Sequence, residues 1–149
     1  MQSGHVELLQ IQRERGLPFE RVMSIQLIIN KGIVGDCHAL GGEKQIAIIS
    51  QEAKHRLENQ EIDGLCFRRF KENMVVVGIE FDLIKTGDVL TTKHVKLEIT
   101  SHTKRCHEEC LLRQKKKVCA LKSQIIFGKV LQSGNIKLGE NIAVDVPQP

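Results

Sequence analysis

The chain has 149 residues, of which 41% are hydrophobic and 27% are charged, and its formal net charge is +4. This length and composition are typical of a soluble globular protein that buries its own core, so we expect a single domain over residues 1–149. No apolar run is long enough to cross a bilayer, and a chain with no Trp, no Tyr and five Phe offers few rings for stacking on single-stranded nucleic acid, so we expect neither a membrane nor a nucleic-acid partner.

Short strands around one glycine-rich loop are predicted for the first half of the chain. The N-terminal stretch "MQSGHVELLQIQRERG" lacks the basic and apolar regions of a signal peptide, which favours the cytoplasm. The clearest element is the helix "QEAKHRLENQ", because Ser50 is a good N-cap for it. Ala53 and Leu57 are candidates for its inner face, for which His55 or Arg56 would compete. The predicted strands cover 5–11, 21–29 and 43–50, the loop covers 32–42 and the helix covers 51–60.

The second half of the chain continues as strands. In "HVKLEIT" (94–100), Val95, Leu97 and Ile99 share one face, which is the period of two expected for a half-buried strand. Short strands at close spacing predict a mainly β fold, namely a compact β-barrel of mostly antiparallel strands with one or two short helices. The other predicted strands lie at 73–79, 123–131 and within 135–146.

Metal ligands are dense in "SHTKRCHEEC" (101–110). On a helix, His102, Cys106 and Cys110 would lie four residues apart and form a stripe. Cys119 could supply a fourth ligand to zinc, although the spacing is not that of a zinc finger. One interpretation of this stretch is therefore a non-catalytic binding module that zinc stabilises.

A reactive thiol is the second interpretation of the same stretch. Lys104 and Arg105 precede Cys106, and their positive charges would stabilise a thiolate. The chain has five cysteines, an odd number that argues against a complete disulfide framework, and cytoplasmic thiols stay reduced. A neighbouring histidine would act as the activating base, and the second cysteine would resolve a disulfide. The candidate catalytic residues are Cys106, Cys110, His102 and His107.

Two further stretches carry candidate site residues. In "GIVGDCHALGG", Asp36 and His38 stand between glycines, so the loop either points backbone amides at an anion or is a tight loop that Asp36 caps. In "FKENMVVVGIE", Glu72 and Asn73 precede an apolar strand. They either reach a cleft at the end of a sheet or are solvated residues before a core strand.

Taken in order, the motifs of the chain resemble the MOSC domain, the C-terminal domain of molybdenum cofactor sulfurases, which also occurs as a stand-alone protein. The stretch "GIVGDCHALGG" is similar to that family's G-I-x-G-D-x-H-A-G loop, and "FKENMVVVGIE" is similar to its F-x-x-E-N-[IL]-x-x-x-G-[IL] passage. The resemblance extends from about Val6 to Val144. Its other parts are "KQIAIISQEA", "LIKTGDVLTT", "KLEITSHTKRC" and "GKVLQSGNIKLGENIAV".

The resemblance implies a β-rich barrel and a role in the sulfur chemistry of the molybdenum cofactor. It implies a protein that binds the cofactor, or carries sulfur as a persulfide on Cys106 or Cys110, with Cys106 as the candidate molybdenum ligand. Some relatives are molybdenum-dependent reductases of N-hydroxylated compounds, and that activity is the alternative. The residues that the resemblance and their chemistry suggest for cofactor binding are Asp36, His38, Lys44, Glu72, Asn73, Lys104 and Arg105.

The resemblance also suggests the partners. The chain is too short to hold the pyridoxal-phosphate desulfurase domain of the fused sulfurases, so we expect no pyridoxal phosphate site and a separate cysteine desulfurase or other sulfur donor. The recipient would be a molybdoenzyme or a protein of cofactor biosynthesis. Two departures from the family pattern are Arg105 where a proline often precedes the cysteine, and Lys44 where an arginine is frequent.

Overall fold

The computed structural model describes residues 2–58, 72–101 and 125–145. The stretch between Ser101 and Ile125, which holds most of the predicted thiol and metal ligands, lies outside these ranges. The elements in chain order are β1 (Gln2–Ile11), β2 (Glu20–Arg21), β3 (Ser24–Ile28), β4 (Gly32–Ile33), β5 (Ile46–Ser50), α1 (Gln51–Glu58), β6 (Met74–Val77), the 3-10 turn η1 (Phe81–Leu83), β7 (Val89–Thr91), β8 (Lys96–Ser101), β9 (Ile125–Gln132), β10 (Gly134–Lys137) and β11 (Asn141–Val144).

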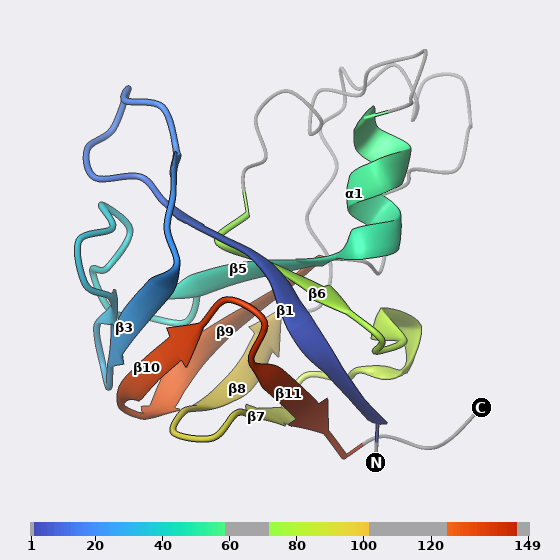
Figure 1. The fold of residues 1–149 in the computed structure, drawn as a ribbon. Coiled ribbons are helices and arrows are strands. Elements are labelled where there is room, and N and C mark those ends of the chain that lie inside the picture. The colour runs from blue at the N-terminus through green and yellow to red at the C-terminus, as the bar shows by residue number, and fades with distance from the viewer. Residues whose placement is uncertain (1, 59–71, 102–124, 146–149) are drawn as a thin grey trace, which may run out of the picture.

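The main sheet closes on itself to form a barrel (Figure 1). Its hydrogen-bonded order is β11, β7, β8, β9, β5, β6 and β1, and β1 returns to β11 in antiparallel register, with Gln2 opposite Val144. The pair β5 and β6 is parallel, whereas the other neighbours in the barrel are antiparallel. The predicted mainly β barrel is therefore confirmed, with α1 as the α-helix of the described residues.

Strand β5 is buried along its whole length because it is covered on both faces. Ile46 and Ile48 point into the barrel core, while Ala47 and Ile49 pack outside it against Ala53 of α1. A strand that is covered on both faces has a nearly continuous apolar sequence, as in "IAIIS". The helix therefore closes the outer face of the barrel at β5 and β6.

The N-cap predicted for α1 is confirmed. The backbone N–H of Ala53 donates to Ser50 Oγ at 3.2 Å, which is the usual bond from the third residue of a helix to its cap. Ala53 is fully buried, but His55 is exposed and does not lie on the inner face. Within the part of the chain that the structure describes, no helix is long and apolar enough to cross a membrane.

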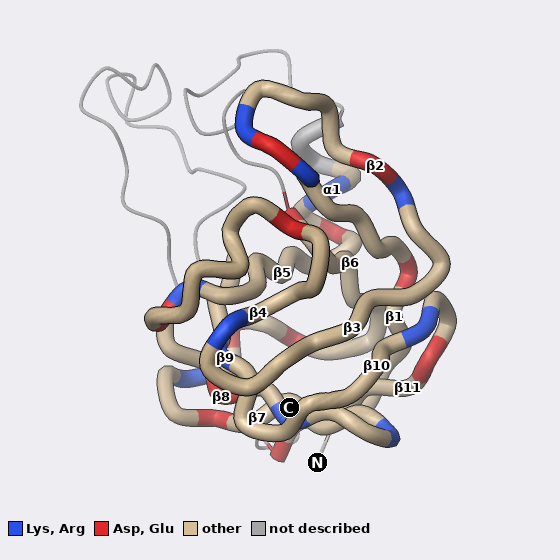
Figure 2. The backbone as a smooth tube through the Cα atoms, turned by 90° about the vertical axis from the view of Figure 1, so that its left-hand side faces the viewer, with Lys and Arg blue, Asp and Glu red and all other residues tan. Residues whose placement is uncertain are grey.

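One predicted strand, 21–29, is divided in two. Its first residues form β2, which pairs with β1, and its later residues form β3, which pairs with β10 in a separate three-stranded sheet with β4. The backbone N–H of Val22 still donates to Leu9 O, and the chain changes partner between Arg21 and Ser24. Figure 2 shows that basic and acidic residues alternate along the loop before β2, where Arg13 Nε lies 2.7 Å from Glu20 Oε2.

Candidate functional site

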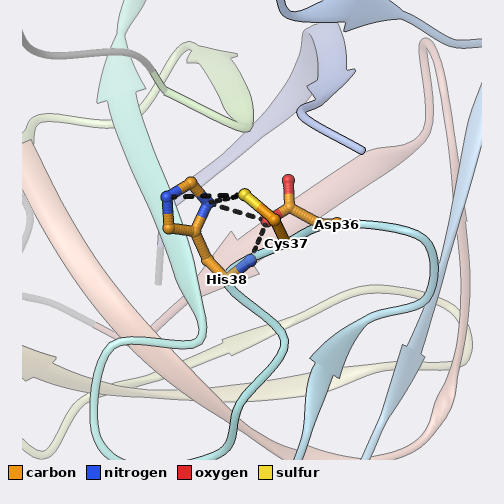
Figure 3. Close-up of side chains that lie close together, drawn as sticks. All are labelled: Asp36, Cys37 and His38. Carbon is orange, nitrogen blue, oxygen red and sulfur yellow. Dashed lines mark hydrogen bonds and ion pairs between the residues drawn. The ribbon is translucent and has the colours of Figure 1, made fainter. Parts of the chain in front are cut away.

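A buried carboxylate lies at the centre of the glycine-rich loop. The side chain of Asp36 is 2% exposed, and each of its oxygens accepts hydrogen bonds. Oδ1 accepts from the backbone N–H of His38 at 2.8 Å and lies 2.9 Å from His38 Nδ1, and Oδ2 accepts from the backbone N–H of Gln12 at 3.0 Å. Figure 3 shows the Asp36 and His38 contacts. Asp36 therefore fixes both its own loop and the end of β1.

The backbone amides of this loop are directed inward. Each N–H from Asp36 to Gly41 donates to an acceptor of the chain itself, so none of these six amides is free for an anion. Gly41 (φ 80°) permits the last of these bonds, because an added Cβ would lie 2.9 Å from the carbonyl oxygen of Asn30. The sequence left open whether this loop points its amides at an anion or is a tight loop that Asp36 caps. In these six residues the structure shows the tight loop capped by Asp36. The acceptors, in order, are Ile33 O, Gln12 O, Asp36 Oδ1, Asp36 O, His38 O and Lys31 O.

Asn73 joins this loop to the wall of the barrel. Its Nδ2 donates to Asp36 Oδ2 at 3.1 Å and to Gln10 O at 3.2 Å, and its Oδ1 accepts from the backbone N–H of Ala47 at 3.0 Å. One side chain thus connects the loop with β1 and β5. Asn73 is 5% exposed, so it is a buried connector and not a solvated residue before a core strand.

Glu72 is also buried and has a cation beside it. It is 1% exposed, and Lys54 Nζ of α1 lies 2.6 Å from its Oε1. Its backbone carbonyl accepts from Gln10 Nε2 at 2.7 Å. The pair fixes the helix to the start of β6. The carboxylate of Glu72 therefore forms a buried ion pair with Lys54.

Cys37 lies beside His38 in this loop, and the sequence interpretation did not select it as a candidate. Its half-buried Sγ lies 3.6 Å from His38 Nδ1 and 3.9 Å from His38 Nε2, and it donates to Gln12 Oε1 at 3.5 Å. The side chain of His38 is 47% exposed. Asp36, Cys37 and His38 each place one ligand atom within 4.8 Å of the others (Figure 3). Their adjacency in "GDCHA" was the signal available in the sequence.

The strand register brings Ser101, at the end of β8, level with this network. Ser101, the last residue of β8, pairs with Phe127 of β9, which pairs with Ala47 of β5. Ala47 in turn exchanges hydrogen bonds with Asn73. Neighbouring strands thus lead from the end of β8 to the Asp36 loop.

The far side of the same loop contacts β8 and β9. The hydroxyl of Thr100 donates to Glu43 O, and Lys44 Nζ lies 4.9 Å from the centre of the Phe127 ring. Lys44 is exposed, so its ammonium group is available beside the end of β8.

Among the predicted site residues, Asp36 thus contacts both His38 and Asn73. Glu72 precedes Asn73 in the chain, and Lys44 lies near the end of β8. The remaining predicted site residues lie outside the described residues, and their roles stay predictions. They are His102, Lys104, Arg105, Cys106, His107, Cys110 and Cys119.

Comparison with known proteins gives one family. A family model described as "MOSC domain" matches residues 35–143, which is more than half of the chain. No curated protein matches the chain. The fold is similar to that of the YuaD protein from Bacillus subtilis, with a TM-score of 0.67 and 18% identity over 99% of this chain and 100% of that one.

The YiiM proteins of two bacteria have similar folds. YiiM from Geobacillus stearothermophilus gives a TM-score of 0.63 at 14% identity, over 95% of this chain and 75% of that one. YiiM from Escherichia coli gives a TM-score of 0.59 at 12% identity, over 97% of this chain and 71% of that one. At these identities the likeness concerns the fold.

Proposed function

This chain belongs to the MOSC domain family, which is related to the molybdenum cofactor, and from that premise we propose that it binds the cofactor, or carries sulfur for it, through a thiol of the segment 102–124. Cys106 is the proposed thiol, with Cys110 as its partner or substitute. The sulfur donor is a cysteine desulfurase or another persulfide protein, and the recipient is a molybdoenzyme or a protein that assembles the cofactor.

One observation carries the proposal. The two motif stretches around Asp36 and Asn73, far apart in sequence, meet in one buried hydrogen-bond network, and strand pairing places Ser101 level with that network. Ser101, the residue that precedes the segment with the proposed thiol, therefore lies level with the network, and Thr100 beside it donates to Glu43 O of the same loop. This arrangement supports a common site, in which the network shapes the loop and the thiol performs the chemistry.

The exposed ammonium group of Lys44 fits an anionic cofactor at this place. Lys44 lies near Ser101 and would meet a pterin phosphate together with Lys104 and Arg105, and His38, half-exposed on the loop, would belong to the same site. Asp36, Glu72 and Asn73 would act by holding the loop and β6 in position, because the side chains of Asp36 and Asn73 are hydrogen-bonded within the protein and Glu72 Oε1 forms an ion pair with Lys54. The bound cofactor supplies a molybdenum centre with affinity for soft sulfur ligands.

The sulfur step needs one thiolate and one persulfide donor. The thiolate of Cys106 attacks the terminal sulfur of the donor's persulfide, so a new S–S bond forms on Cys106 as the donor's S–S bond breaks. The donor cysteine leaves as a thiolate, and no external oxidant or reductant is consumed. Lys104 and Arg105 would stabilise the attacking thiolate.

Replacing Lys44 by methionine is expected to weaken cofactor binding by about 10- to 150-fold, because it removes one charge-assisted contact to phosphate, of the order of 1.5–3 kcal/mol. The full chain is mixed anaerobically with cofactor released from a molybdoenzyme, and pterin that co-elutes on gel filtration is quantified by fluorescence after oxidation. Lys93→Met is the matched control, since Lys93 is an exposed lysine on the turn between β7 and β8. Equal retention by wild type and Lys44→Met would remove Lys44 from the site.

A further inference from the structure

We propose that Asp36, Cys37 and His38 form a binding site for a divalent cation of the zinc type. The site shares Asp36 and His38 with the loop of the proposed function, but it goes beyond that function because it adds Cys37 as a ligand and requires neither the molybdenum cofactor nor the thiols of the segment 102–124. It lies in the loop between β4 and β5, on residues that follow one another in the chain.

The donor set defines the class of cation. The three residues offer a thiol sulfur, an imidazole nitrogen and a carboxylate oxygen, all within 4.8 Å of one another. Thiolate and imidazole together select zinc and similar transition metals over magnesium or calcium, which prefer oxygen ligands. Three protein ligands leave a fourth position open for water or for a small ligand.

The distances are compatible with a common metal ion. Bond lengths of about 2.3 Å to sulfur and about 2.0 Å to nitrogen place the two ligands of a tetrahedral zinc ion about 3.5 Å apart. In the structure Cys37 Sγ lies 3.6 Å from Nδ1 and 3.9 Å from Nε2 of His38. The half-buried Cys37 and exposed His38 side chains would rotate to direct both ligands at the ion.

The charge of Asp36 favours a cation at this place. Its carboxylate is 2% exposed, and its ion-pair partner among the described residues is the imidazole of His38, with no lysine or arginine paired to it there. A buried charge without a cationic partner is costly, so a metal ion beside it would compensate the charge. Oδ2 is anchored by Gln12 N and Asn73 Nδ2, which leaves Oδ1 on the side of His38.

Gln12 is positioned to support the thiol in this site. Its Oε1 accepts from Cys37 Sγ at 3.5 Å, and its Nε2 donates to Leu17 O at 2.9 Å, which fixes the orientation of the amide. The thiol releases its proton when the metal binds, so the bond to Gln12 is exchanged for the bond to the ion, and Gln12 holds the thiol in place until then.

The test is a titration of the full chain, purified with chelator and reductant, with Co²⁺ as a spectroscopic probe and Zn²⁺ as a competitor. A near-ultraviolet sulfur-to-cobalt band at one equivalent reports a thiolate ligand. We expect Cys37→Ser to abolish this band and both Cys37→Ser and His38→Gln to weaken Zn²⁺ binding at this site at least about tenfold. Both side chains are at least partly exposed, so the variants should fold, which circular dichroism checks.

Matched controls separate this site from the others. A loss of Zn²⁺ affinity in Cys106→Ser or Cys110→Ser would indicate a cation bound by the segment 102–124. His94→Gln, which replaces an exposed histidine elsewhere, should leave Zn²⁺ affinity unchanged. The proposal is supported when the Cys37 and His38 variants both lose affinity. It is overturned when either of them binds Zn²⁺ as tightly as wild type, or when wild type binds none. Failure of sulfur loading on Cys106 and Cys110 would leave this result unchanged, so the two proposals fail independently.

Discussion

Replacing Asp36 by alanine is expected to lower the free energy of unfolding by about 3–5 kcal/mol, because it leaves several amide donors without their acceptor and each buried one costs about 1–3 kcal/mol. The substitution removes the acceptor of three hydrogen bonds, from the backbone N–H groups of Gln12 and His38 and from Asn73 Nδ2. It also leaves the Gln12 amide without its partner in a part-buried position. Urea unfolding followed by circular dichroism measures the change.

The control for this prediction is Asp145→Ala, since Asp145 is an exposed aspartate after β11. Surface substitutions of that kind change stability by about 0.5 kcal/mol or less. Asn73→Ala should reproduce much of the Asp36 effect, because it breaks the same network from the other side. A loss below about 1 kcal/mol in Asp36→Ala would mean that the loop is held by other contacts.

Replacing Lys54 by methionine is expected to cost about 3–5 kcal/mol, because it leaves the carboxylate of Glu72 buried without its cation. Glu72 is 1% exposed and its Oε1 lies 2.6 Å from Lys54 Nζ. The double variant Lys54→Met with Glu72→Leu should recover most of this loss, since a buried ion pair and an apolar pair of similar volume are often close in stability.

Thermal and urea unfolding of the single and double variants measure the Lys54 effect. Lys31→Met, at an exposed lysine between β3 and β4, is the matched control. If the double variant were no more stable than Lys54→Met, the charge of Glu72 would not be the cause of the loss. Glu72 would then have a role outside this ion pair.

The strands could be predicted because their burial follows the sequence period. Val95, Leu97 and Ile99 are all fully buried, as alternation in "HVKLEIT" indicates, and the N-cap at Ser50 follows from local hydrogen bonding. Both features depend on residues that are neighbours in the chain. The division of 21–29 into β2 and β3 was missed because it depends on the partners β1 and β10, which the local pattern does not contain.

The sequence selected residues for the candidate site but did not show which of them are in contact. Asp36, His38, Glu72 and Asn73 were selected from two separate stretches, yet the sequence does not reveal that Asn73 Nδ2 donates to Asp36 or that Glu72 pairs with Lys54. Those contacts arise from barrel closure and from the parallel pairing of β5 with β6. Cys37 was overlooked because a lone thiol in a glycine-rich loop gains meaning only when its distance to His38 is known.

The most direct measurement of the proposed function is the site of sulfur loading. The full chain is incubated with a cysteine desulfurase and isotopically labelled cysteine, persulfides are trapped by alkylation, and the labelled peptides are identified by mass spectrometry. We predict labelled sulfur on Cys106 or Cys110. The label should disappear when the cysteine that carries it is replaced by serine, and it should remain in the control variant Cys66→Ser. A folded chain whose Cys106 and Cys110 both remain without labelled sulfur would contradict sulfur transport by this domain.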